Sequence, residues 1–198
     1  MFDLFDDIPK PDIVWLPDWL DAPTASDTLA ALLDEITWQQ DSMTTPAGKI
    51  PFPRLTAWQG DPGAVYVYSG IRNIPRPWTP TVLALKTRAE SESKAPFNSV
   101  LINRYRTGMD SMGWHADNEP ELGPQPVIAS VSLGTTRTFD FRHTKTRQTH
   151  TLQLTHGSLL IMQGRTQLEW AHRVPKEPEA RGERINLTFR NVDSSARK

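Results

Sequence analysis

The sequence contains no cysteine. This absence excludes disulfides, thiolate zinc sites, iron–sulfur clusters and cysteine nucleophiles within the chain. A metal site would have to be built from histidine and carboxylate side chains. The five histidines are therefore the first residues to place.

Net charge and long apolar runs are also scarce. The formal net charge is −1, so the whole molecule exerts little pull on nucleic acid or anionic membranes, and a phosphate-binding surface would have to be a local patch. No run of 18 apolar residues occurs, and the start, "MFDLFDDIPK", lacks the basic and apolar regions of a signal peptide. We expect a cytoplasmic monomer that does not enter a membrane.

Length and periodicity predict one domain over residues 1–198, with helices near its start. In "SDTLAALLDEITW", apolar residues recur at helical spacing, and Ser26 is the expected N-cap. A second helix is expected in "TPTVLALKTRAES", capped by Thr79 with Pro80 in its first turn. Between them, residues 41–65 are rich in Pro, Gly and Thr and are interpreted as a long loop or irregular hairpin.

From residue 97 onward the pattern is that of short strands separated by turn residues. The segments are "FNSVLINRY", "VIASVSLG", "RTFDFRH", "HTLQLTHGSLLIMQG" and "ERINLTFR". Strands in series after a helical start indicate a mainly β (α+β) protein, an antiparallel sandwich or jelly roll buttressed by N-terminal helices. We expect the jelly-roll core at about 97–192.

The stretch "GWHADNEPELG" holds a candidate metal pair, His115 and Asp117. On an extended strand these two side chains point to the same side. Alone, the pair favours a solvated turn over a metal site. With His172 in "EWAHRVP", however, it completes the two-histidine, one-carboxylate triad of non-haem Fe(II) oxygenases. The other three histidines are interpreted as surface or turn residues: His143, His150 and His156.

The segment "RINLTFR" separates polar from apolar side chains by strict alternation. Either it is an ordinary strand with one face in water, or its polar face holds a dicarboxylate, which arginine recognises through its planar fork. In "NRY", Asn103 and Tyr105 similarly share one face of another strand. The polar face of "RINLTFR" comprises Arg184, Asn186, Thr188 and Arg190.

Taken together, these motifs resemble the AlkB family of Fe(II)/2-oxoglutarate-dependent nucleic-acid dealkylases. The resemblance covers roughly residues 50–192. Within the family, the sequence is most similar to the single-strand-preferring animal branch. The resemblance implies a double-stranded β-helix, that is, a jelly roll. It depends on "PRLTAWQGD", "VYVYSG", "FNSVLINRY", "WHADNEPELG", "IASVSLGTTRTFDFRH", "GSLLIMQG", "WAHRVPK" and "RINLTFR", in family order.

The resemblance implies a role for each matched residue. Arg184 would pair with the distal carboxylate of 2-oxoglutarate, and Arg190 would lie near its iron-chelating end. Iron would be bound by His115, Asp117 and His172. The cosubstrate pocket would be lined by Asn103, Tyr105, Arg184, Asn186, Thr188 and Arg190. The damaged base would be held by Tyr66, Tyr68, Asn118 and Glu119.

The implied reaction is oxidative dealkylation with Fe(II), 2-oxoglutarate and O₂. An N-methyl group is hydroxylated and lost as formaldehyde, while 2-oxoglutarate becomes succinate and CO₂. Alkylated DNA is the expected substrate, with RNA as a second candidate, and the target base must leave the stack. The alternatives are a 2-oxoglutarate-dependent hydroxylase of a protein or small molecule, and a non-catalytic jelly-roll binding module.

Two departures from the family pattern bear on substrate preference. The double-strand branch carries an aromatic finger before a Gly-Lys pair, where this sequence has Ala47 in "TPAGKIPFPR"; Phe52 is further along the chain. Alanine puts intercalation into a duplex in doubt. Asn118 replaces an acid near the base, which leaves base preference open.

A local basic patch is expected in "TRTFDFRHTKTR", and Arg142 is its candidate substrate-binding residue. Alternatively, these cations are ordinary solvated side chains on a strand surface. Near the base, Trp58 and Trp114 are assigned equally to stacking or to the core. The cations of this patch would be Arg137, Arg142, Lys145 and Arg147, with Arg165, Arg173 and Lys176 joining them.

Overall fold

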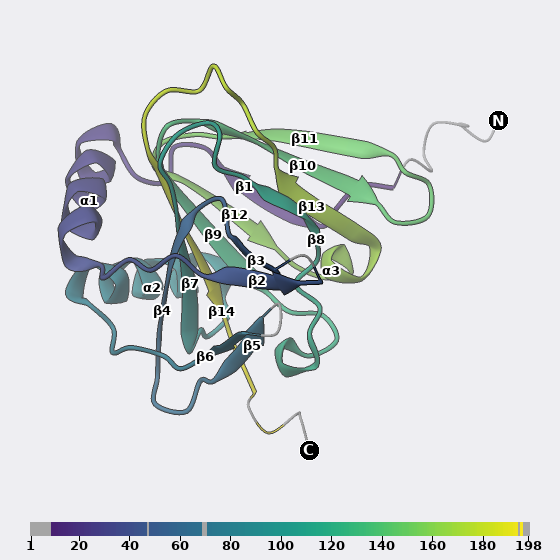
Figure 1. Cartoon of the computed structure of the whole chain (residues 1–198), viewed down its shortest axis with the longest axis horizontal. Helices are drawn as coiled ribbons and strands as arrows, with labels where there is room; N and C mark the ends of the chain where they lie inside the picture. Colours follow the sequence, from purple (N-terminus) through teal and green to yellow (C-terminus); the bar gives the residue numbers. More distant parts are fainter. Residues whose placement is uncertain (1–8, 47, 69–70, 194, 196–198) are drawn as a thin grey trace.

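A computed structural model describes residues 9–46, 48–68, 71–193 and 195, and its core is two facing antiparallel sheets (Figure 1). The six-stranded sheet has the order β1 (Ile13–Leu16), β12 (Ser158–Met162), β9 (Ile128–Gly134), β14 (Arg184–Arg190), β7 (Ser99–Tyr105) and β4 (Leu55–Gly60). The four-stranded sheet has the order β11 (Thr149–Leu154), β10 (Arg137–His143), β13 (Trp170–Val174) and β8 (Met112–His115). This arrangement confirms the predicted jelly roll.

Helices α1 (Ala22–Glu35) and α2 (Pro80–Ser93) lie on the side of the six-stranded sheet away from the four-stranded sheet (Figure 1). Their buried residues form one apolar cluster with Ile185, Leu187 and Phe189 of β14. The expected helical buttress is therefore confirmed. Smaller elements complete the chain: the hairpins β2 (Ser42–Thr45)–β3 (Gly48–Pro51) and β5 (Tyr66–Tyr68)–β6 (Ile71–Asn73), the 3₁₀ turn η1 (Pro120–Leu122), and α3 (Thr166–Glu169).

The start of α1 differs from the prediction. Asp21, not Ser26, is the N-cap, because its carboxylate accepts the backbone N–H of Thr24 at 2.9 Å. Ser26 lies inside the helix and its hydroxyl bonds His156 Nε2 at 3.2 Å. Thr79 is the N-cap of α2, but its side chain makes no capping bond.

The interpretation of residues 41–65 as irregular was partly wrong. The β2–β3 hairpin lies there, but so does β4, which pairs with β7 along its whole length. The sequence did not predict β4, because this short strand at the edge of the main sheet follows a segment rich in Pro and Gly.

Strand β14 is buried on both faces, which excludes the interpretation of a strand with one face in water. Its apolar side chains face the helices, and its polar side chains face the space between the sheets. None of the helices in the described ranges is long and apolar enough to cross a bilayer.

Candidate metal and cosubstrate site

Three predicted metal ligands meet between the two sheets. His115, Asp117 and His172 each offer a ligand atom, and these atoms lie within 4.8 Å of one another. The two histidine ring centroids are 4.2 Å apart. Two histidines and a carboxylate at this separation are the donor set that non-haem Fe(II) requires.

A bulge in the four-stranded sheet positions this cluster. His115 pairs with His172, whereas Met112 pairs with Val174, so β8 has one more residue than β13 between the two pairs. Such an irregularity re-aims side chains, and here both Met112 and His115 line the cavity between the sheets. Asp117 follows after β8 has ended, rather than lying on the strand as expected.

The protonation states suit metal binding. His115 Nδ1 lies 2.8 Å from the carbonyl oxygen of Gly113; if this nitrogen donates, the lone pair is on Nε2, the tautomer a ligand needs. Burial lowers the pKa of His115 and brings that of His172 to about 3. Burial alone would raise the pKa of Asp117, but the charge of Arg190 and the two histidines lower it to about 2.

Asp117 also shows why a cation fits here. Its Oδ2 accepts a hydrogen bond from Arg190 Nη2 at 2.8 Å, whereas its buried Oδ1 has no hydrogen-bond partner among the described residues. A buried carboxylate oxygen without a partner is costly. A metal ion at the cluster would remove that cost, so the residues fit Fe(II).

The predicted cosubstrate residues line or adjoin the same cavity. Arg184 is 1% exposed and donates from Nη2 to Ser132 Oγ at 2.8 Å, while its buried Nε and Nη1 have no hydrogen-bond partner in the part of the chain that the structure describes. Its guanidinium carbon lies 5.1 Å from the Tyr105 ring centroid. Burial lowers the pKa of Arg184 to about 10, so it stays charged at neutral pH. A buried guanidinium with unused donors fits a carboxylate. The cavity itself is lined by Asn103, Tyr105, Asn186, Thr188 and Arg190 from the predicted set.

The sequence did not single out Arg54. This residue is 5% exposed, and its Nε donates to Asn103 Oδ1 at 2.8 Å. Its charge helps to lower the pKa of His115, after burial and together with Arg190. Arg54 precedes β4, and no local pattern distinguishes it from an ordinary surface arginine.

Gln167 is a second residue that the sequence analysis missed. It is 2% exposed; its Oε1 accepts the backbone N–H of Asp117 at 2.9 Å, and its Nε2 donates to Met162 Sδ at 3.4 Å. It therefore ties α3 to the segment that carries the carboxylate. The two residues are 50 positions apart, so only the folded chain reveals the contact.

We expect Gln167→Leu to weaken Fe(II) binding by about 10- to 100-fold, because residues that orient metal ligands contribute that much. The measurement is a metal titration in the absence of cosubstrate. Gln153→Leu, on exposed β11, is the matched control. Wild-type affinity in the Gln167 variant would mean that this bond does not position Asp117.

Burial of neutral His172 predicts a stability loss in acid. The folded protein excludes a proton that the unfolded chain binds below pH 6.5, so stability is full above that pH and falls as pH drops toward 3. Between pH 7 and 4.5 we expect the metal-free protein to lose about 2–3 kcal/mol from this group, at 1.36 kcal/mol per unit. Denaturant unfolding at both pH values should show a smaller loss in His172→Asn. An equal loss of unfolding free energy in the natural protein and in His172→Asn would contradict the assignment of His172 as a buried neutral side chain.

The predicted base-holding residues are only partly placed. Asn118 is exposed next to the metal cluster, and the buried Glu119 Oε2 has no hydrogen-bond partner within the described ranges. The backbones of Tyr66 and Tyr68 form β5, but their side chains lie outside the described structure, as does Ala47. Trp58 belongs to the core, at 4% exposure.

The expected basic patch is smaller than predicted. Arg137 is 1% exposed, and its Nε pairs with Glu177 at 2.7 Å, so it is not a surface cation. Arg165 pairs with Glu169 at 2.6 Å. Arg142 lies on the outer face of the four-stranded sheet rather than in the cavity, with its guanidinium carbon 4.1 Å from the Trp114 ring centroid.

The remaining histidines lie outside the metal cluster. His156 accepts the backbone N–H of Gly134 at 2.9 Å, a structural role as predicted. His143 is 8% exposed and accepts the N–H of Thr146 at 3.1 Å, so its assignment to the surface was wrong. His150 is half-buried beside Phe141.

Comparisons with known proteins identify the family of this chain. Residues 12–190 match the 2OG-Fe(II) oxygenase superfamily. The chain is 43% identical over 186 residues to alpha-ketoglutarate-dependent dioxygenase alkB homolog 3 of Mus musculus, covering 89% of this chain and 64% of that protein. It is 41% identical over 148 residues to DNA oxidative demethylase ALKBH2 of Mus musculus, covering 71% of this chain and 62% of that protein.

These relatives are longer, since the chain spans less than two thirds of each. The structure of OsALKBH1 superposes with a TM-score of 0.66 at 19% identity, over 92% of this chain and 99% of that one, which supports the fold alone. The ordered motifs, the two-sheet fold and the matched relatives lead to one assignment. The chain belongs to the 2OG-Fe(II) oxygenase superfamily and, within it, to the AlkB family.

Proposed function

We propose that this protein is an Fe(II)/2-oxoglutarate-dependent dioxygenase that removes N-methyl groups from bases in DNA, with RNA as a second candidate. The observation that carries the proposal is the buried cluster of His115, Asp117 and His172, which opens on the cavity lined by the polar face of β14. The names of the relatives, a DNA oxidative demethylase among them, favour a nucleic acid over the alternative of a protein or small-molecule substrate.

In this proposal each residue has a defined task. His115, Asp117 and His172 bind Fe(II), and Arg190 holds Asp117 ionised and oriented through its 2.8 Å bond. Arg184, which is buried, binds the distal carboxylate of 2-oxoglutarate. Fe(II), when bound, would couple two oxidations by O₂: one oxygen atom would enter succinate as 2-oxoglutarate loses CO₂, and the other would hydroxylate the N-methyl group, which then leaves as formaldehyde.

The substrate side rests on fewer contacts. Asn118 and Glu119 follow the metal carboxylate directly, so a base whose alkyl group reaches the metal would meet them first. Tyr66 and Tyr68 are proposed to hold that base from β5, and Arg142 to contact the strand outside the cavity. A cytoplasmic location, a monomeric state and a single domain over 1–198 stay predictions.

The test is repair of a short single-stranded DNA that carries one N-methylated base. We expect loss of the methyl group, followed by mass spectrometry, only when Fe(II) and 2-oxoglutarate are both present. The same oligonucleotide with His172→Ala protein is the control. If the methylated oligonucleotide stays unchanged although the protein is folded and binds iron, the proposal is contradicted.

Single-stranded substrate should be preferred over a duplex. Flipping a base from a duplex costs a few kcal/mol, and an inserted apolar side chain can offset part of this, but Ala47 is too short to do so. We expect kcat/KM to be about tenfold higher on the single strand, which corresponds to a difference of about 1.4 kcal/mol in activation free energy. Ala47→Phe should narrow the gap at fixed salt. Equal or better duplex repair by the natural sequence would point to another wedge, such as Phe52.

A further inference from the structure

A buried arginine that the proposed mechanism does not use lies at one end of the space between the sheets. Arg137 begins β10, and its side chain points between the sheets, in phase with the cavity residue Phe139. Its Nε pairs with Glu177 Oε2 at 2.7 Å. Its other two nitrogens donate, at distances between 2.6 and 3.4 Å, to the backbone carbonyl oxygens of Thr107, Gly108, Asp110 and Pro175. One side chain therefore holds two loops, 106–111 between β7 and β8, and 175–183 between β13 and β14.

The two loops also bond directly to each other. The N–H of Glu177 donates to the carbonyl oxygen of Gly108 at 2.8 Å, and the N–H of Gly108 donates to that of Ala180 at 3.0 Å. Gly108 does not have a positive φ, but a Cβ at this position would overlap the carbonyl oxygen of Glu177. Glycine is thus required by the close approach of two backbones. The loops can meet only because Gly108 has no side chain.

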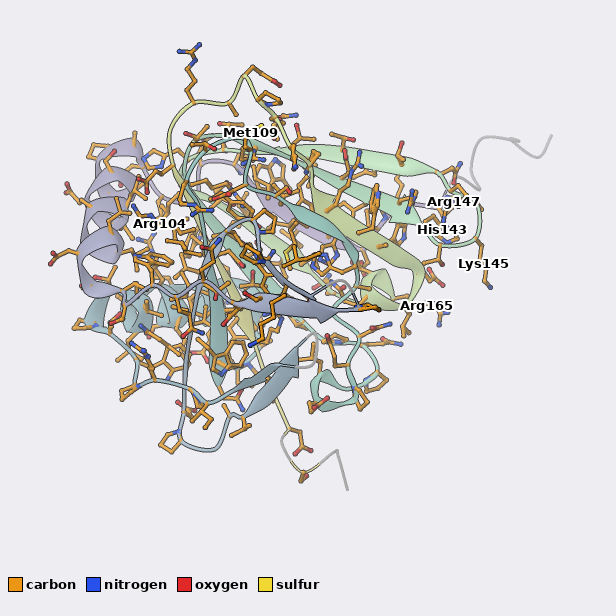
Figure 2. All side chains as sticks on the ribbon, viewed as in Figure 1. Arg104, Met109, His143, Lys145, Arg147 and Arg165 are labelled. Atoms are coloured by element: carbon orange, nitrogen blue, oxygen red, sulfur yellow. The ribbon has the colours of Figure 1, made fainter. Side chains whose placement is uncertain are left out.

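We call Arg137, Glu177 and these two loops the distal closure. Figure 2 shows its place in the molecule through Met109, which belongs to the first loop. Met109 lies near the end of the four-stranded sheet where β10 begins, whereas His143, the last residue of β10, lies at the other end. The distal closure is therefore well separated from the β10–β11 turn.

Both loops begin and end on residues of the cosubstrate site. Loop 106–111 connects Tyr105 to Met112, and both of these residues line the cavity. The other loop connects Val174, which also lines the cavity, to Arg184. A shift of either loop would therefore displace the cavity wall.

The charges of the distal closure adjoin the residues proposed for the distal carboxylate. The guanidinium carbons of Arg137 and Arg184 lie 5.6 Å and 5.1 Å from the ring centroid of Tyr105, so one ring contacts an arginine from each sheet. Burial is the main cause of the lowered pKa of Arg184, and the charge of Arg137 lowers it further. Burial opposes ionisation of Glu177, but hydrogen bonds from Thr138 and Arg137 hold its pKa below the ordinary value. Ionised Glu177 therefore balances the second buried cation.

We propose that the distal closure sets the length of the oxo acid that the cavity accepts, with Arg137 as its positioning residue. The inference rests on the proposed function, because it takes 2-oxoglutarate as the cosubstrate. Tyr105 and Arg184 can hold the distal carboxylate at a fixed distance from the metal only while the loops that follow and precede them stay closed. An acid with one more methylene, 2-oxoadipate, would have to push this wall outward. One methylene is worth about 10- to 200-fold in a fitted pocket, so we expect a preference for 2-oxoglutarate of at least about tenfold.

The first test measures the binding of 2-oxoglutarate and of 2-oxoadipate by calorimetry. The protein carries Mn(II) in place of Fe(II), so that no turnover occurs. Gly108→Ala forces the loops apart without removing a charge or a cavity residue. We expect this variant to bring the ratio of the two affinities from at least about tenfold to close to one, while its affinity for Mn(II) stays that of the natural protein.

Arg137 is tested by a paired replacement, because removing one partner of a buried ion pair would itself destabilise the protein. Arg137→Met combined with Glu177→Leu leaves no charge of this pair uncompensated. We expect it to unfold at nearly the denaturant concentration of the natural protein, yet to show an affinity ratio close to one. Its KM for 2-oxoglutarate should rise while kcat at saturating 2-oxoglutarate changes little. A purely structural role would leave the ratio and this KM unchanged.

Two single variants complete the comparison. Arg137→Lys keeps the charge but not the planar fork that reaches both loops, so it should recover the affinity ratio only in part. Arg88→Met is the matched control, because Arg88 also donates to a backbone carbonyl oxygen, that of Trp19 at 3.3 Å, but lies on α2. It should keep the natural ratio.

Failure of the closure and failure of the proposed function give different results. If the natural protein binds neither oxo acid, the proposed function is wrong, and the length selection is wrong with it. If the natural protein prefers 2-oxoglutarate, and folded Gly108→Ala and the paired variant keep that preference, only the role of the distal closure is overturned. Equal binding of both acids by the natural protein would overturn that role as well.

Discussion

Alanine at His115, Asp117 or His172 is expected to abolish dealkylation, with kcat/KM lower by more than ~100-fold, since changes beside metal ligands alone cost about 10- to 100-fold. Each replacement leaves two of the three protein ligands. Asp117→Ala has a second effect, because it leaves Arg190, 2% exposed, without its 2.8 Å partner. Removing one partner of a buried ion pair costs about 3–5 kcal/mol, so this variant should also be the least stable.

Metal affinity and repair should be measured together on the same protein. His156→Ala is the matched control, because His156 bonds Gly134 and Ser26 and lies outside the metal cluster. It should keep iron binding. If His172→Ala retains both near-normal iron affinity and repair, the metal site has been assigned to the wrong residues.

Arg184→Ala should raise the KM for 2-oxoglutarate by at least roughly 30-fold, since truncating a buried charge-assisted contact costs about 2–5 kcal/mol. The side chain is 1% exposed, and two of its buried nitrogens have no hydrogen-bond partner among the residues that the structure describes. The effect should fall on the KM for 2-oxoglutarate far more than on the KM for DNA.

Two further arginine variants make this result interpretable. Arg184→Lys keeps a charge but not the planar fork, and it should recover only part of the loss. Arg104→Ala removes the neighbouring arginine that pairs with Glu183 at 2.7 Å, and it should leave the KM for 2-oxoglutarate close to normal. A normal value in folded Arg184→Ala would remove this residue from the cosubstrate site.

Short-range periodicity predicted the two faces of β14, whereas the metal cluster was predicted from its residue types and from the family resemblance, since Asp117 follows the end of β8 instead of lying on it. His115 and Asp117 are two apart, and the alternation of "RINLTFR" correctly separated the helix-facing residues from the cavity-facing ones. The alternation did not reveal that the four-stranded sheet covers the polar face of β14, because that packing depends on strands far away in the chain.

Arg137 shows a signal that was present but misinterpreted. It lies in phase with Phe139 and Phe141 on β10, so the alternation that placed those rings inside also places Arg137 inside. By contrast, Arg54 and Gln167 reach the site through contacts with Asn103 and Asp117, which are distant in sequence. No local pattern could have identified them.

The most direct test of the central claim is the stoichiometry of the reaction on methylated single-stranded DNA. Formaldehyde, succinate and repaired base should form in equal amounts, and succinate formation should fall sharply when the same DNA carries no methyl group. Succinate formed at an equal rate without the methylated base, or repaired base formed without succinate, would contradict a dioxygenase that couples 2-oxoglutarate oxidation to dealkylation.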